Sequence, residues 1–253
     1  MSARSAAVRQ AVRRAPMTTA VTALTALVGA AQFLFPAVLE ELQRDPAGLR
    51  AGQWWRLFTP LLVQGAGWGQ YAFNLLGSLL VGVALEARYG ARRWLAFYLA
   101  AGIAGIVTAY LWQPDSTGSG SSDAVAGLIG ALTALLWSGR PLPWWPGYLY
   151  GTFFASYLTG LAAAGLIAAV LAGNATTVLV MAVRRAARPR LVRALVSTVV
   201  AAGAVAMSAL HDGHGVGLLT GLMLGFLLRP AQAGQAAAAD PCDSSVCSPA
   251  RSR

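Results

Sequence analysis

Charged residues are scarce in this sequence. Only 11% of its 253 residues are Asp, Glu, Lys or Arg, whereas 57% are hydrophobic. Soluble domains usually carry about a quarter charged residues, so this chain lacks the polar surface that a soluble globule needs. Apolar runs close to the ~20 residues that a bilayer-crossing helix requires recur from residue 17 to residue 229. The composition therefore predicts an all-α, polytopic transmembrane helical bundle.

Acidic residues are fewer than basic ones, with 9 Asp and Glu against 19 Lys and Arg and a net charge of +10. A basic chain can bind nucleic acid, but here the arginines cluster in short stretches between apolar runs. Cytoplasmic loops of membrane proteins have this pattern. We therefore expect no nucleic-acid partner. We expect a multi-pass protein of the bacterial inner membrane, surrounded by lipid and with both termini in the cytoplasm.

Cysteine is nearly absent. The two cysteines, Cys242 and Cys247, lie in a polar tail that should be cytoplasmic, where structural disulfides are rare. A single C-x4-C spacing is weak evidence for a metal site, and no other group of ligand residues stands out. The sequence predicts neither a metal nor an organic cofactor.

The chain divides into a basic cytoplasmic N-terminus (1–16), a transmembrane domain (17–229) and a disordered, Ala-, Gln- and Ser-rich cytoplasmic tail (230–253). The stretch 40–69 is too polar to span, and its tryptophans predict that it lies at the outer interface. The predicted spans are 17–39, 70–87, 94–112, 122–138, 145–163, 166–183, 191–210 and 212–229.

The number of spans depends on residues 141–185. Arg140 and the arginines of 184–193 should share the cytoplasmic side, so an even number of crossings must separate them. This favours a tight helical pair and a total of eight spans. The alternative is six spans, with part of 141–185 re-entrant or interfacial.

Polar residues inside spans are costly and mark candidate functional sites. Three stand out in the predicted spans: Asn74, Ser122 and His214. Small residues share one helical face with Ser122 and another with His214; they are Ala126, Gly130 and Ala134, and Gly217, Gly221 and Gly225. Small residues at this spacing let membrane helices approach closely. Two helices packed along these faces would bring a serine hydroxyl and an imidazole together, as an activated nucleophile requires.

Four motifs in this order resemble those of the rhomboid family. Trp55-Arg56-Leu57-Phe58-Thr59 is similar to W-R-x-x-T, and Gln70 to Asn74 is similar to H-x-x-x-N. Gly120-Ser121-Ser122-Asp123, followed by a Gly/Ala-rich helix with Gly127 and Gly130, resembles G-x-S-G. His214 to Gly217 matches H-x-x-G, ahead of Gly221 in the last helix.

The resemblance implies a rhomboid-like core and an intramembrane serine endopeptidase that cuts transmembrane protein substrates without a cofactor. Ser122 would attack the peptide carbonyl, and His214 would act as base and then as acid. The Ser122 backbone N–H and the Asn74 side chain would hold the oxyanion. Trp55, Arg56 and the glycines would be structural.

Three residues depart from the family pattern. Asp123 replaces a glycine, Gln70 replaces a histidine, and Ala126 stands where many members have an aromatic residue under the catalytic histidine. The Gln70 amide can still donate to an oxyanion. If these changes mark lost chemistry, the alternative is an inactive rhomboid-like protein that binds transmembrane clients. A transporter is disfavoured because the chain has no repeated half.

Simpler interpretations remain open for single residues. The alternatives are that Ser122 is a helix N-cap, that His214 is an interfacial histidine, and that Asn74 is an interhelical hydrogen-bonding residue. Asp212 could orient His214, although its loop position favours a solvated carboxylate. His211 is expected to be solvated.

Overall fold

The computed structural model describes residues 15–138, 145–186 and 188–229, and the regular elements of these residues are all helices. Arg140, Cys242, Cys247 and the predicted tail lie outside the described residues. The helices are α2 (Pro16–Leu34), α3 (Ala37–Leu42), α4 (Pro46–Arg50), η1 (Trp54–Leu57), η2 (Thr59–Leu62), α5 (Gly67–Tyr89), α6 (Ala91–Trp112), α7 (Ser122–Leu135), α8 (Trp145–Arg185), α9 (Pro189–Ala209) and α10 (Gly213–Leu227).

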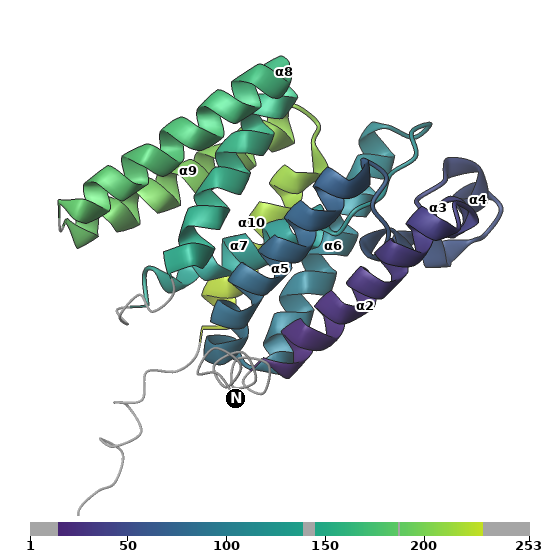
Figure 1. Cartoon of the computed structure of the whole chain (residues 1–253), viewed down its shortest axis with the longest axis horizontal. Coiled ribbons are helices and arrows are strands. Elements are labelled where there is room, and N and C mark those ends of the chain that lie inside the picture. The colour runs from purple at the N-terminus through teal and green to yellow at the C-terminus, as the bar shows by residue number, and fades with distance from the viewer. Residues whose placement is uncertain (1–14, 139–144, 187, 230–253) are drawn as a thin grey trace, which may run out of the picture.

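Five of the described helices are long and apolar enough to cross a membrane: α2, α5, α6, α8 and α9. Helices α7 and α10 are apolar but have only 14 and 15 residues, which corresponds to roughly 21–23 Å at 1.5 Å per residue. Every α7 residue from Ala124 to Leu135 is buried. Helix α7 lies in the middle of the bundle (Figure 1), where other helices surround it.

The first predicted span, 17–39, is wrong at its end. Helix α2 stops at Leu34, and Phe35 adopts an extended conformation with φ −130° and ψ 91°. The cause is Pro36, which disfavours helical geometry in the residue before it and starts the separate helix α3. At the other end, buried Glu86 of α5 accepts from the backbone N–H groups of Met17 and Thr18 and so fixes the start of α2.

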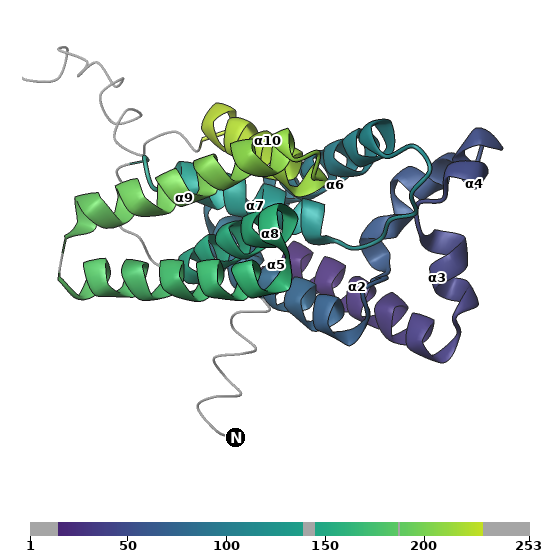
Figure 2. The same cartoon turned by 90° about the horizontal axis from the view of Figure 1, so that it is seen from above.

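Helix α8 is a helical hairpin. Its two halves meet at Gly165, whose φ of 82° and ψ of −168° are non-helical and are readily adopted only by glycine. The halves then pack together, because a Cβ on Gly160 would lie 2.8 Å from the Ala168 carbonyl oxygen. The predicted helical pair, with its break between 163 and 166, is confirmed. Its second half runs beside α9 (Figure 2).

Helices α7 and α10 pack backbone against backbone. A Cβ on Gly221 would overlap the backbone of Gly127, and one on Gly217 would lie 2.6 Å from the Asp123 carbonyl oxygen. A Cβ on Gly225 would lie 2.8 Å from Ala131. The predicted packing along the two small-residue faces is confirmed. As a result, the N-terminal ends of α7 and α10 lie next to each other.

The segment between α2 and α5 is held by Arg56. Its Nη1 donates to the carbonyl oxygens of Glu40 (2.8 Å) and Gln43 (3.0 Å), and its Nε donates to the Gln53 side chain (2.6 Å). Trp54 and Trp55 of the same turn are 65% and 50% exposed. Buried arginine and exposed tryptophans fit the structural role expected of this motif at the membrane interface.

Candidate active site

The candidate nucleophile, Ser122, is the first residue of α7. The loop before it turns at Gly120, where φ is 130° and where a Cβ would come within 2.5 Å of Gln70 Nε2. The N-cap position belongs to Ser121, and no side chain caps this helix. The alternative that Ser122 is an N-cap is therefore wrong, because its hydroxyl is directed elsewhere.

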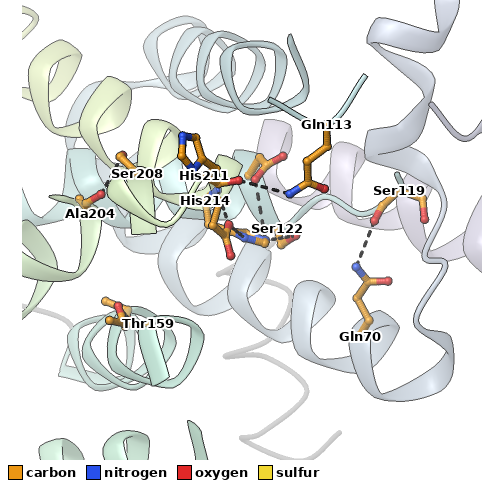
Figure 3. A network of polar contacts seen from close by, with 12 residues as sticks. Gln70, Gln113, Ser119, Ser122, Thr159, Ala204, Ser208, His211 and His214 are labelled. Carbon is orange, nitrogen blue, oxygen red and sulfur yellow. Dashed lines mark hydrogen bonds and ion pairs between the residues drawn. The ribbon is translucent and has the colours of Figure 1, made fainter. Parts of the chain in front are cut away.

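The candidate base, His214, is the second residue of α10. Its Nε2 lies 2.8 Å from Ser122 Oγ, across 92 positions of sequence (Figure 3). This is the distance at which an imidazole can take the proton of an attacking hydroxyl. Close packing of α7 on α10 makes the contact, since both side chains sit at the adjoining ends of those helices.

Asp212 contacts the other ring nitrogen of His214. It is the N-cap of α10, and its Oδ1 accepts from the His214 backbone N–H at 2.9 Å and also contacts Nδ1. The carboxylate is thus paired with His214, in contrast to the solvated position that its loop location favoured.

Asp123, directly after the nucleophile, lies between α6 and α10. Its Oδ1 is 3.8 Å from His214 Nε2, and its side chain is 15% exposed. Gly105 of α6 makes the space, because a Cβ there would come within 2.5 Å of the Asp123 carboxyl carbon. The carboxylate therefore faces the imidazole and the cavity wall.

A polar cavity of about 430 Å³ opens onto Ser122 and His214. Its walls also include Gln70, Asp123, Ala162 of α8 and the nearly buried Arg44. Ser122 and His214 therefore line a cavity and are not enclosed in the packed interior of the bundle.

His211 also borders the cavity but takes no part in the pairing. Its backbone has a φ of 58°, and its ring packs edge-on against Trp112 with the ring centroids 5.2 Å apart. This contact directs the ring away from Ser122, so the structure offers His214 alone as the base.

The two predicted oxyanion residues have different surroundings. Gln70 lines the cavity, and its Nε2 donates to the Ser119 carbonyl oxygen at 3.1 Å. Asn74, one turn further along α5, is fully buried and does not line the cavity. Its Nδ2 donates to Gln64 Oε1 at 2.7 Å, and its Oδ1 has no hydrogen-bond partner among the described residues. The structure thus brings Gln70, rather than Asn74, beside the nucleophile.

Sequence reasoning missed Phe154. This buried residue of α8 meets the His214 ring edge to face, with centroids 6.1 Å apart. Phe154 thus places an aromatic ring against the imidazole. Ala126 of α7, at the position where many family members have an aromatic residue, has no ring to offer. The signal available in the sequence was the aromatic run of residues 148–157, but its spacing does not say which helix it faces.

The helical bundle and the paired serine and histidine define a multi-pass membrane protein with a serine-protease-like site. A family model described as "Rhomboid domain" matches residues 51–231, which is well over half of the chain. The chain belongs to the rhomboid family, whose members are typically intramembrane serine peptidases.

Individual relatives match over shorter stretches. The chain is 41% identical over 91 residues to Rhomboid protease GluP of Bacillus subtilis, covering 36% of this chain and 18% of that protein. It is 36% identical over 125 residues to Putative rhomboid protease YdcA of the same species, covering 47% and 62%. It is 35% identical over 82 residues to Rhomboid-like protease 3 of Toxoplasma gondii, covering 32% and 31%. The chain thus spans less than two thirds of each of these relatives. No solved structure matches it significantly.

Proposed function

We propose that this protein is an intramembrane serine endopeptidase that cleaves membrane proteins within or next to their transmembrane helices. The observation that carries the proposal is the 2.8 Å separation between His214 Nε2 and Ser122 Oγ at the wall of a polar cavity. A serine hydroxyl is a weak nucleophile unless an adjacent base takes its proton. The pair supplies both groups, and family membership supports peptide bonds of membrane proteins as the substrate.

In the proposed reaction, Ser122 Oγ attacks the carbonyl carbon and His214 Nε2 takes its proton. The tetrahedral intermediate then collapses, and His214 returns the proton to the leaving amine. Water from the cavity attacks the acyl-enzyme, again with His214 as base, and releases the new carboxyl terminus and the free serine. The complete cycle returns Ser122 and His214 to their starting states.

The developing oxyanion needs hydrogen-bond donors. The backbone N–H of Ser122 is in the first turn of α7, where helix N–H groups have no partner within the helix. Gln70 Nε2 is a side-chain donor that borders the cavity near Ser122, because a Cβ on Gly120 would lie 2.5 Å from Gln70 Nε2 and 3.4 Å from Ser122 Oγ. Asn74, predicted for this role from the family motif, would contribute only if its amide turned from Gln64 toward the cavity.

We further propose eight spans, with the N-terminus (1–16) and the tail (230–253) in the cytoplasm and 17–229 as the membrane domain. The turn of the α8 hairpin would lie on the same side as the active-site cavity, because Ala162 lines that cavity. The short helices α7 and α10 would begin below the membrane surface, which places the reacting pair beside the substrate helix. A bacterial inner membrane agrees with the clustered arginines.

A client-binding protein without protease activity is the second candidate. The observation that favours it is Asp123, whose carboxylate lies 3.8 Å from His214 Nε2 and competes with Ser122 for the imidazole. An acidic group beside an oxyanion also opposes the charge that forms there. The two candidates differ in whether Ser122 reacts.

The test is covalent labelling of the purified protein in detergent or liposomes with a fluorophosphonate or an isocoumarin. We expect the label at Ser122, identified by mass spectrometry, and its loss in Ser122→Ala. We also expect wild-type protein, but not Ser122→Ala, to cut at least one of a panel of reconstituted single-span membrane proteins. A folded wild-type protein that takes no label and cuts no substrate would favour the client-binding function.

A further inference from the structure

Asp212 provides more than a helix cap. We propose that it is the positioning residue of a Ser122–His214–Asp212 triad, an inference that rests on the proposed protease function. The resemblance to the family implied only a serine–histidine pair. In this chain a carboxylate contacts Nδ1 of the imidazole, while Ser122 contacts Nε2 (Figure 3 shows the pairing of His214 with Ser122).

The contacts fix which nitrogen of His214 carries the proton. A carboxylate only accepts hydrogen bonds, so the Asp212 contact requires a proton on Nδ1 and leaves the lone pair on Nε2. Nε2 is the nitrogen that faces the Ser122 hydroxyl at 2.8 Å. The neutral imidazole is thereby held in the one tautomer that can act as base.

The same carboxylate stabilises the charged form of the base. When His214 takes the proton of Ser122, both ring nitrogens carry protons and the ring becomes a cation. Asp212 Oδ1 contacts Nδ1, so it pairs with this cation and leaves the proton on the ring. The imidazolium that forms during attack is therefore paired in the transition state.

The local backbone explains why the carboxylate points to the ring. Asp212 has φ −102° and ψ 123°, the extended geometry of an N-cap, and its amide donates to the Met207 carbonyl oxygen at 2.9 Å. Gly213, the next residue, packs so closely on α6 that a Cβ would lie 2.8 Å from the Gly105 carbonyl oxygen. These contacts hold the turn in place, and one oxygen then serves both the cap and the ring.

Other groups face His214 but cannot replace Asp212. Asp123 of α7 approaches on the Nε2 side, where Ser122 also lies, so it does not hold the Nδ1 proton. Phe154 of α8 is apolar, and Arg44 borders the same cavity as a cation. Among these groups, Asp212 is the only acceptor at Nδ1.

The test separates the charge of Asp212 from its capping role. Asp212→Asn and Asp212→Ser both keep a side-chain oxygen that can cap α10, but neither carries a charge. The matched control is Asp115→Asn, because the Asp115 side chain is 89% exposed and borders no part of the cavity. For each variant we would measure kcat and KM, the pH dependence of kcat, the rate of fluorophosphonate labelling and the Tm.

We expect both Asp212 variants to lose about 10³- to 10⁴-fold in kcat, with KM and Tm close to wild type. The labelling rate should fall in parallel. The acid limb of the kcat profile should move to lower pH, because an unpaired imidazolium forms less readily. Asp115→Asn should match wild type in all of these measurements.

Two results would overturn the proposal. One is an Asp212→Asn enzyme that keeps kcat within about threefold of wild type with an unchanged pH profile. The other is a loss of activity in both Asp212 variants that follows an equal loss of Tm, since capping alone would then account for it. Failure of the proposed function is distinct, because in that case wild-type protein itself takes no label at Ser122.

Discussion

Phe154 of α8 meets His214 of α10 edge to face, with ring centroids 6.1 Å apart and an interplanar angle of 73°. Phe154 also stacks on Phe73 of α5, with the ring planes parallel and the centroids 5.7 Å apart. Three helices thus meet at the candidate base. Helix α8, the region for which the sequence left the number of spans open, therefore supplies one wall of the site.

This contact predicts that Phe154→Leu lowers kcat about 10- to 100-fold, because the imidazole loses one of the walls that hold it and small misplacements of reacting groups are costly. Phe153→Leu is the matched control, since Phe153 stacks on Tyr157 and has no ring contact with His214. Cleavage kinetics of the two variants, with Tm as a check on folding, would decide. Equal losses in both would show that general packing, and not the His214 contact, matters.

The reacting pair should behave as one unit. We expect Ser122→Ala and His214→Ala each to abolish cleavage of a membrane substrate, and the double variant to be no worse than either single one. Residues that act together in one step are strongly non-additive. His211→Ala should retain most activity, because that ring packs on Trp112. Additive losses, or inactivation by His211→Ala, would contradict the assignment.

Kinetic measurements can distinguish the contributions of the two candidate oxyanion donors, Gln70 and Asn74. We expect Gln70→Ala to reduce kcat by about 100- to 1,000-fold while Ser122 still takes the covalent label, because a missing donor leaves the nucleophile in place. Asn74→Ala should also lose activity and keep some labelling if Asn74 has the role that the family motif implies. If it acts only through its hydrogen bond to Gln64, its loss should instead appear as a lower Tm with kcat largely kept.

Much of this site could be predicted from sequence because its signals are local. Ser122 and His214 stand out as polar residues at the start of apolar helices, and small residues at helical spacing identify the faces that pack. The break at Gly165 follows from loop charge and segment length. Each of these inferences uses residue type, spacing or segment length along the chain, and none requires a contact between distant residues.

The rest depends on contacts between distant residues. Phe154 reaches His214 from a helix 60 positions away, and nothing in the aromatic run says which way it faces. Asp212 could be a solvated loop residue or a partner of His214, and only the turn geometry decides. The Gln64 side chain that binds Asn74 lies in a loop. A loop has no hydrophobic periodicity from which the position of its side chains could be predicted.

Helix packing gives a further prediction. Gly221→Ala should strongly reduce both activity and Tm, because a Cβ there would overlap the backbone of Gly127 and push α10 from α7. Gly69→Ala makes the same change on α5, where a Cβ meets nothing within 4 Å, and should be tolerated. Activity assays and thermal unfolding of the two variants would test this. Equal tolerance at both positions would mean that α7 and α10 do not pack as described.

The eight-span topology predicts the side of each loop. Single cysteines would be introduced in a protein with Cys242→Ser and Cys247→Ser, and then labelled with a membrane-impermeant thiol reagent. Ala66, Asp115 and Ala164 are exposed, and the last lies at the turn of the α8 hairpin next to Ala162 of the cavity wall. Cysteines at these three positions should react from outside. Arg188→Cys should react only from the cytoplasmic side, and so should Arg140→Cys.

Ala164 is the decisive position, because the two topologies differ there. With eight spans, each half of α8 crosses the membrane and the turn at Gly165 reaches outer water. In the six-span alternative the hairpin is re-entrant or interfacial and does not cross, so Ala164→Cys would not react from outside, whereas Asp115→Cys still would. Labelling of Arg188→Cys and Arg140→Cys from opposite sides would exclude the paired crossing altogether, because an even number of spans must return the chain to the side from which it started.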